Sequence, residues 1–140
     1  SPFTITDKRM TRFNITLDEA SNFVINCMKK MKGKEVFIPK LPSYDLNTLV
    51  KSINPNKKVK IIGIRTGEKL HEELISAADF GNTLEYKDSF IIYPMGINTK
   101  KKFNLKIDLK KSYNSYDNRD FLSIKNLSNL IKSQLKNFNK

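Results

Sequence analysis

The chain has 140 residues and a formal net charge of +12, because 26 Lys and Arg residues stand against 14 Asp and Glu residues. This length is enough for one hydrophobic core, but it leaves no room for a cofactor domain and a separate substrate domain. The apolar runs fall short of the roughly 20 residues that cross a bilayer, and residues 1–4 lack the pattern of a signal peptide, so we expect no membrane insertion. The chain begins without a methionine, which suggests a fragment, a processed product or a tag remnant.

The positive charge has two interpretations. It favours an acidic partner such as nucleic acid, an anionic membrane surface or a phosphorylated small molecule. Lysine mixed with abundant Asn and Ile is also typical of a biased genome composition, in which case the lysines form a solvated surface. Charge alone therefore leaves the class of partner open.

Cys27 is the single cysteine of the chain. One thiol forms no internal disulfide and no metal cluster, so we expect a reducing, cytoplasmic setting. Cys27 also falls within an amphipathic helical pattern, which favours a buried, inert thiol over a nucleophile.

The first predicted helix has a capping box at its start. In residues 16–19, the side chains of Thr16 and Glu19 can each accept a hydrogen bond from the other residue's backbone N–H group. Gly33 is expected to end this helix as a left-handed C-terminal cap. The apolar positions between them recur at three- and four-residue steps and form one stripe: Leu17, Ala20, Val24, Cys27, Met28 and Met31.

A short buried strand and a second helix are expected next. Residues 35–39 are mostly apolar and end at a proline, as a short strand does. Ser43 and Asp45 can start a helix that continues to Ile53, where the Asn-Pro-Asn run of residues 54–56 ends it.

The following segment predicts a strand, a turn and a helix. Residues 58–64 have the pattern of a strand that delivers Arg65 at its end, and residues 68–75 suit a helix. Two more strands, residues 84–86 and 90–93, flank the polar residues 87–89. The sequence therefore predicts a small mixed α/β fold.

The C-terminal part has a different character. Residues 95–118 are polar and lysine-rich, and we interpret them as an extended or partly ordered arm. Ser123 then caps a final helix with an apolar face, which is expected to dock on another surface and could form a subunit contact. We expect a substrate-binding lobe at residues 1–94 and an arm with a helix at residues 95–140. The apolar face consists of Leu127, Leu130, Ile131 and Leu135.

Residues 64–72 (Ile-Arg-Thr-Gly-Glu-Lys-Leu-His-Glu) contain the motif with the clearest chemistry. The guanidinium of Arg65 can bind a phosphate through two parallel hydrogen bonds, and the carboxylate of Glu68 can accept hydrogen bonds from sugar hydroxyls. Gly67 between them allows a tight turn. This pattern predicts a nucleotide-sugar site, although by itself it also fits a surface loop that leads into a charged helical turn.

Several other chemistries lack their residues. The chain has no Gly-x-Gly-x-x-Gly motif, no P-loop and no Tyr-x-x-x-Lys pair, so we expect no catalytic and no cofactor-binding residue. His71 begins a His-Glu-Glu run, but position 75 is Ile75 where a zinc protease has its second histidine, so no metal site is expected. For His71 we favour a polar partner or exposure over a role in catalysis.

A second charged cluster lies near the N-terminus, at residues 6–13 (Thr-Asp-Lys-Arg-Met-Thr-Arg-Phe). By itself such a cluster is typical of a solvated loop. Asp7 can pair with a neighbouring arginine at little energetic consequence, because exposed ion pairs contribute little.

Four motifs in a fixed order resemble one protein family. They are residues 5–13 (Ile-Thr-Asp-x-Arg-Met-Thr-Arg-Phe), 16–20 (Thr-Leu-Asp-Glu-Ala), 36–43 (Val-Phe-Ile-Pro-Lys-Leu-Pro-Ser) and 61–72 (Ile-Ile-Gly-Ile-Arg-Thr-Gly-Glu-Lys-Leu-His-Glu). Together they resemble the C-terminal, substrate-binding part of extended short-chain dehydrogenases/reductases, above all bacterial UDP-N-acetylglucosamine 4,6-dehydratases and related capsular polysaccharide biosynthesis proteins. Residues 113–118 (Tyr-Asn-Ser-Tyr-Asp-Asn) also resemble the tail of the capsule-type branch.

The resemblance implies half of an enzyme. In this family a Rossmann domain, which has no counterpart here, carries NADP and the catalytic groups. The parent would be a lyase and a homo-oligomer that oxidises a UDP-N-acetylhexosamine at C4, eliminates water across C5 and C6 and returns the hydride. The fragment alone would bind no cofactor and no nucleic acid, and would be inactive.

By the same resemblance, Arg65 would hold the UDP diphosphate, Glu68 the sugar hydroxyls of the nucleoside, and Arg12 the phosphate or uridine side. Two alternatives remain open at this point. One is a UDP-N-acetylglucosamine 4-epimerase of the same family, and the other is a basic binding module for nucleic acid or another acidic partner.

Overall fold

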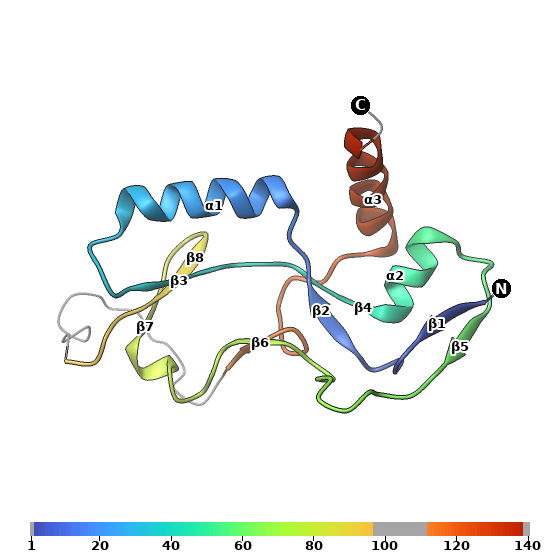
Figure 1. Ribbon diagram of the computed structural model, residues 1–140, viewed down its shortest axis with the longest axis horizontal. Helices are drawn as coiled ribbons and strands as arrows, with labels where there is room; N and C mark the ends of the chain where they lie inside the picture. The colour runs from blue at the N-terminus through green and yellow to red at the C-terminus, as the bar shows by residue number, and fades with distance from the viewer. Residues whose placement is uncertain (1, 97–111, 139–140) are drawn as a thin grey trace. The chain divides into compact units, whose positions relative to one another are not determined.

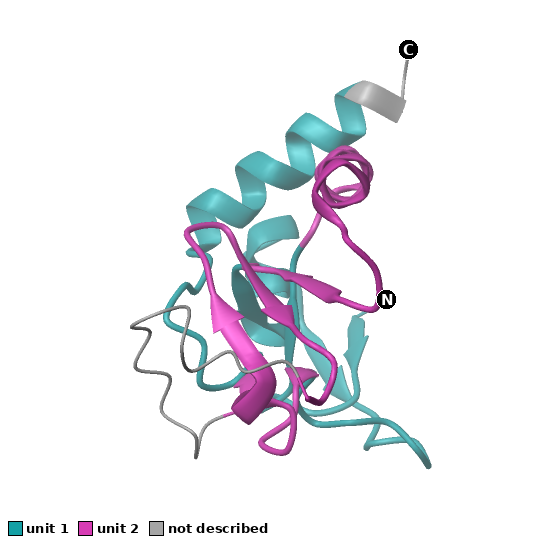
Figure 2. Ribbon diagram, turned by 90° about the vertical axis from the view of Figure 1, so that its left-hand side faces the viewer, with its two compact units in different colours: residues 1–14, 42–72, 115–140 teal, residues 15–41, 73–114 magenta. Residues whose placement is uncertain are grey.

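The computed structural model describes residues 2–96 and 112–138 (Figure 1). Within these ranges the chain forms two compact units, each made of segments that are distant in the sequence (Figure 2). Unit 1 contains residues 1–14, 42–72 and 115–140, and unit 2 contains residues 15–41 and 73–114. The largest sheet among the described residues has three strands, and the predicted small mixed α/β fold is confirmed. The division at residue 94 into a substrate-binding lobe and an arm stays a prediction.

Unit 1 combines two short strand pairs with two helices. The pair β1–β5 is parallel, and the pair β2–β4 is antiparallel, with Arg12 opposite Tyr44. Helix α3 packs against α2, and Leu127 on the predicted apolar face of α3 is buried there, so this face partly docks within the chain. The elements are β1 (Phe3–Ile5), β2 (Thr11–Phe13), β4 (Ser43–Asp45), α2 (Leu46–Ile53), β5 (Val59–Ile61) and α3 (Ile124–Phe138).

The helices of unit 1 begin where their caps predict. The carboxylate of Asp45 accepts a hydrogen bond from the backbone N–H of Thr48 at 2.7 Å, and α2 ends at Ile53. The Ser123 hydroxyl accepts from the backbone N–H of Asn126 at 3.2 Å at the start of α3. Ser43 lies in β4 and does not cap α2, so the cap is Asp45 alone.

Unit 2 contains a three-stranded antiparallel sheet in the order β3-β8-β7 and a second pair, β6–β9. The predicted strands around residues 87–89 are confirmed as the hairpin β7–β8. Residues 97–111 of the predicted arm lie outside the described residues, whereas its later part contributes β9. The elements are α1 (Leu17–Lys30), β3 (Val36–Pro39), β6 (Glu73–Ile75), the 3₁₀ helix η1 (Phe80–Asn82), β7 (Thr83–Glu85), β8 (Ser89–Ile92) and β9 (Tyr113–Asn114).

Helix α1 has the predicted capping box but a different end. The Glu19 carboxylate accepts from the Thr16 N–H at 2.8 Å, and the Thr16 hydroxyl accepts from the Glu19 N–H at 3.3 Å. The helix ends at Lys30, and its C-cap is Met31, whose N–H donates to the Cys27 carbonyl and whose backbone is extended. The prediction of Gly33 as the left-handed cap is therefore wrong. Gly33 has a positive φ of 120°, but it lies beyond the cap, where its N–H donates to Glu35.

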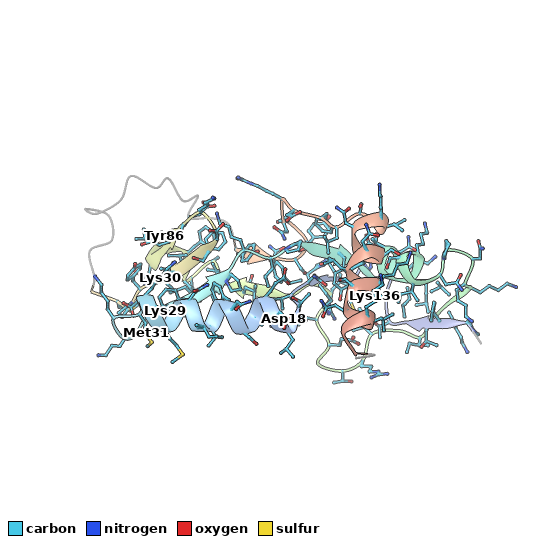
Figure 3. All side chains as sticks on the ribbon, turned by 90° about the horizontal axis from the view of Figure 1, so that it is seen from above. Asp18, Lys29, Lys30, Met31, Tyr86 and Lys136 are labelled. Carbon is cyan, nitrogen blue, oxygen red and sulfur yellow. The ribbon has the colours of Figure 1, made fainter. Side chains whose placement is uncertain are left out.

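The apolar stripe of α1 is exposed. No residue of α1 is buried, and Leu17 and Met28 are 77% and 67% exposed. Figure 3 shows Met31 with Lys29 and Lys30 at the end of the helix opposite to Asp18. Cys27 is only half-buried, and desolvation raises the pKa of its thiol.

Strand β3 is also less buried than predicted, because Val36 is exposed and the rest of the strand is half-buried. Apolar periodicity indicates which side chains can be buried together, but it does not indicate what covers them. None of the helices in the described ranges has the length and apolar character that crossing a membrane requires.

A tyrosine pair in unit 2 predicts a loss of stability at high pH. The hydroxyls of Tyr86 and Tyr93 lie 3.0 Å apart, and desolvation followed by this hydrogen bond raises the pKa of Tyr93 to about 12. An unfolded tyrosine ionises near pH 10, whereas Tyr93 in the folded chain stays protonated to about pH 12. The contribution of protonated Tyr93 to the free energy of unfolding is therefore complete below about pH 10 and is lost as the pH rises to about 12.

Urea unfolding at a series of pH values checks this prediction. The difference between the wild-type chain and Tyr93→Phe isolates the tyrosine from the lysines that titrate in the same range. The phenylalanine variant should lose less stability across this window, and parallel pH profiles for the two proteins would refute the prediction.

Candidate functional site

The predicted tight turn at Gly67 is present in unit 1. The Arg65 carbonyl accepts from the backbone N–H of Glu68 at 3.0 Å, and Gly67 has a φ of +81°. A positive φ at the third residue of a four-residue turn is the signature of a type II turn, which favours glycine there. The Glu68 carboxylate accepts from the Arg65 N–H at 3.3 Å and closes the turn from the other side. Gly67 is therefore required by backbone geometry.

The Arg65 side chain projects from this turn. It is exposed, and it forms no salt bridge with any residue in the ranges 2–96 and 112–138. The N–H donors of a guanidinium in this position are available to form two parallel hydrogen bonds with a phosphate. The strand before it, β5, ends at Ile61, so Arg65 follows a short loop and does not lie directly at a strand end as predicted.

Arg12, from β2, lies against the same turn. Its Nη2 is 3.7 Å from Oε1 of Glu68, and its Nε is 3.5 Å from Oε1 of Glu72. Nη2 also donates to the carbonyl of Lys69 at 3.0 Å, and Nη1 donates to the carbonyl of Leu70 at 3.2 Å. The structure thus brings together Arg12 and Glu68, two of the three residues predicted to contact substrate.

The predicted helix over residues 68–75 is wrong. After the turn the chain runs irregularly to β6, which pairs with β9. Residues 70 and 72 make their backbone hydrogen bonds to other segments: the Thr11 N–H donates to the Leu70 carbonyl at 3.1 Å, and the Ser115 N–H donates to the Glu72 carbonyl at 2.8 Å. These partners are distant in the sequence, so they override the helical propensity of the segment.

A chain of polar side chains lies beside the turn. The Thr11 hydroxyl is 2.8 Å from Nδ1 of His71 and 2.7 Å from the Ser115 hydroxyl. The Ser115 hydroxyl also accepts from the backbone N–H of Glu72 at 2.9 Å. The rings of His71 and Tyr116 are in contact, with their centroids 4.6 Å apart. The predicted polar partner of His71 is therefore present, and it is Thr11 of β2.

Thr11 and Ser115 belong to this cluster, but the sequence alone does not single them out. Both residues are buried, with 4% and 0% of their surface exposed. Each lies inside a motif that the sequence did identify, residues 5–13 and 113–118 respectively. The motifs therefore contain both residues, but the sequence does not indicate that Thr11 and Ser115 lie close together in space.

Two ionisable residues of unit 1 have shifted pKa values. Desolvation raises the pKa of Tyr44, its partner across the β2–β4 pair, and the positive charge of Arg12 opposes that rise. Asp7 pairs with Arg9 at 2.8 Å, and the hydrogen bond from Arg9 lowers the pKa of Asp7 to about 2. This confirms the predicted pairing of Asp7 with a nearby arginine.

Comparison with known proteins identifies the family. Residues 1–94 match the family described as polysaccharide biosynthesis protein. The chain belongs to this family. The match includes the turn at Arg65 and the strand that carries Arg12, and it confirms the resemblance predicted from the four motifs.

Relatives of this polysaccharide biosynthesis family member include named enzymes. The chain is 39% identical over 137 residues to the UDP-N-acetylglucosamine 4,6-dehydratase (inverting) of Campylobacter jejuni, a match that covers 91% of the chain and 41% of the relative. It is 29% identical to the UDP-glucose 4-epimerase of Rickettsia canadensis, covering 96% of the chain and 43% of the relative.

The fold has a counterpart among solved structures. The X-ray structure of Pen from Bacillus thuringiensis matches with a TM-score of 0.75 and 34% identity, over 94% of this chain and 40% of that one. The chain therefore spans about two fifths of the length of the relatives that it matches.

Proposed function

We propose that this chain is the substrate-binding lobe of a longer nucleotide-sugar enzyme, a UDP-N-acetylglucosamine 4,6-dehydratase of bacterial surface polysaccharide biosynthesis. The observation that carries the proposal is the turn of residues 65–68, in which an exposed arginine and a carboxylate flank a glycine of positive φ. The 39% identity to a named dehydratase supports the choice of substrate. We call the proposed longer protein the parent.

In the proposed site Arg65 binds the diphosphate and Glu68 binds hydroxyl groups of the nucleoside sugar. A guanidinium binds phosphate oxygens in pairs, which fixes the orientation of the ligand as well as its position. The Glu68 carboxylate uses one oxygen on the Arg65 N–H, and a carboxylate has further lone pairs for sugar hydroxyls. Arg12 belongs to the same site, and its part is argued in the next subsection.

The described residues do not fit a dinucleotide cofactor. The four glycines with positive φ are isolated from one another at positions 33, 63, 67 and 96, so no cluster of them forms a phosphate cradle. We therefore assign no NADP contact to this chain. In the proposed parent, a cytoplasmic lyase, the cofactor would supply hydride transfer from a part of the protein outside this chain, and the turn would contribute substrate binding only.

A 4-epimerase is the second candidate, because a named UDP-glucose 4-epimerase is among the relatives. Product analysis separates the two reactions. The parent, incubated with UDP-N-acetylglucosamine, is expected to yield a 4-keto-6-deoxy sugar, which is detected by the loss of one water in mass spectrometry. A product of unchanged mass with an inverted C4 centre would replace the dehydratase proposal with the epimerase. A substrate returned unchanged would contradict both.

A further inference from the structure

The guanidinium of Arg12 is engaged by the protein at every nitrogen. Nη1 donates to the carbonyls of Thr11 and Leu70, and Nη2 donates to the carbonyl of Lys69 and to the sulfur of Met10. The remaining nitrogen, Nε, lies 3.5 Å from the Glu72 carboxylate. The side chain is 22% exposed. An arginine with all its donors on protein groups has no free fork for a phosphate.

Four of the six residues that contact the Arg12 guanidinium lie in one segment. Lys69, Leu70 and Glu72 follow the turn directly, and Glu68 within the turn is the fourth partner, at 3.7 Å. Their carbonyl and carboxylate oxygens carry full or partial negative charge, so one guanidinium holds four of the five residues from 68 to 72, a segment that forms no helix. The hydrogen bond from the Thr11 N–H to the Leu70 carbonyl adds a second attachment of this segment to β2.

We propose that Arg12 is a positioning residue, which fixes the segment from Arg65 to Glu72 on β2 and so presents Arg65 and Glu68 to the substrate without contacting the phosphate itself. This inference rests on the proposed function of the turn. It changes the role of Arg12 that the family resemblance implies, from a substrate contact to a support for the two residues that make the contact.

Arginine is required for this role because of its shape. Its planar fork reaches carbonyls of two neighbouring residues and a carboxylate at the same time, whereas a lysine ammonium is a single point with three donors. The variant Arg12→Lys keeps the charge and loses the fork, so it separates positioning from simple electrostatic attraction. A phosphate contact tolerates lysine better, because lysine also binds phosphate as a point charge.

The first test measures how stable the hydrogen bond of the turn is in the 140-residue chain without ligand. Hydrogen exchange of the Glu68 amide reports the bond to the Arg65 carbonyl. In Arg12→Ala and Arg12→Lys this amide should exchange about tenfold faster or more, as expected when charge-assisted hydrogen bonds are lost. Arg65→Ala should leave it unchanged, because the Arg65 side chain is exposed. Unchanged exchange in Arg12→Ala would overturn the proposal.

The second test is a double-mutant cycle on the KM of the parent for UDP-N-acetylglucosamine. If Arg12 acts through the turn, Arg12→Ala raises KM in the wild-type background and adds little once Arg65 and Glu68 are both replaced by alanine. Independent, multiplicative effects in the two backgrounds would show that Arg12 contacts the substrate itself and would overturn the inference. The role of the turn is judged separately, because Arg65→Ala without effect on KM contradicts the proposed function whatever Arg12 does.

Discussion

Replacing Ser115 with alanine is expected to lower the free energy of unfolding by about 1–3 kcal/mol, the usual cost of leaving buried hydrogen-bonding groups without a partner. Ser115 is 0% exposed, and its hydroxyl bonds both the Thr11 hydroxyl and the backbone N–H of Glu72. The Ser115→Ala variant keeps the backbone bond to the Glu72 carbonyl, but it leaves the Glu72 N–H without its acceptor. We therefore expect looser attachment of residues 71–72 as well as lower stability.

Ser43→Ala is the matched control for Ser115→Ala. Ser43 is also 0% exposed, but the side-chain amide of Asn118 that bonds its hydroxyl also donates to the carbonyl of Asp120. The loss at Ser43 should therefore be smaller, about 1 kcal/mol for one neutral hydrogen bond. Urea unfolding of the two variants gives the comparison. Equal losses at the two serines would show that the Thr11–Ser115 contact has no special importance for this part of the fold.

The parts of the fold that the sequence predicts are those with local causes. The start of α1 at its capping box and the Asp45 cap of α2 depend on side chains within three residues of the backbone groups that they satisfy. The turn at Gly67 is of the same kind, because the conformation of one residue decides it. These features are confirmed with bounds close to those predicted.

The errors have non-local causes. Residues 68–75 have the composition of a helix, but Leu70 and Glu72 bond to Thr11 and Ser115, which are 59 and 43 positions away in the sequence numbering. No periodicity within the segment reports such partners. The apolar stripe of α1 is exposed for a similar reason. An amphipathic pattern shows which side chains share a face, but it does not show whether the described residues include a surface that covers this face.

The candidate site was predicted in part. Arg12 and Glu68 are 56 positions apart in the sequence and yet form an ion pair at 3.7 Å, as expected for two motifs of one site. What the sequence could not predict is which donors remain available. Arg12 and Arg65 are both arginines in charged motifs, and only the structure distinguishes the one engaged by carbonyls from the one exposed to solvent.

The second large effect concerns Arg65. If it binds the diphosphate, Arg65→Ala removes charge-assisted hydrogen bonds worth about 1.5–3 kcal/mol, which corresponds to a rise in KM of roughly 10- to 150-fold. The fold should be unaffected, because the side chain is exposed. Arg65→Lys should recover only part of the loss, since lysine keeps the charge without the fork.

Arg119→Ala provides the matched control, because Arg119 is another exposed arginine of unit 1 and its loss changes the net charge equally. The most direct test of the substrate-binding role is therefore the KM of the parent for UDP-N-acetylglucosamine, measured for the wild type, Arg65→Ala and Arg119→Ala. We predict a rise of about tenfold or more for Arg65→Ala and a change within about twofold for Arg119→Ala. Equal KM values for Arg65→Ala and the wild type would contradict the proposal that this turn binds the substrate.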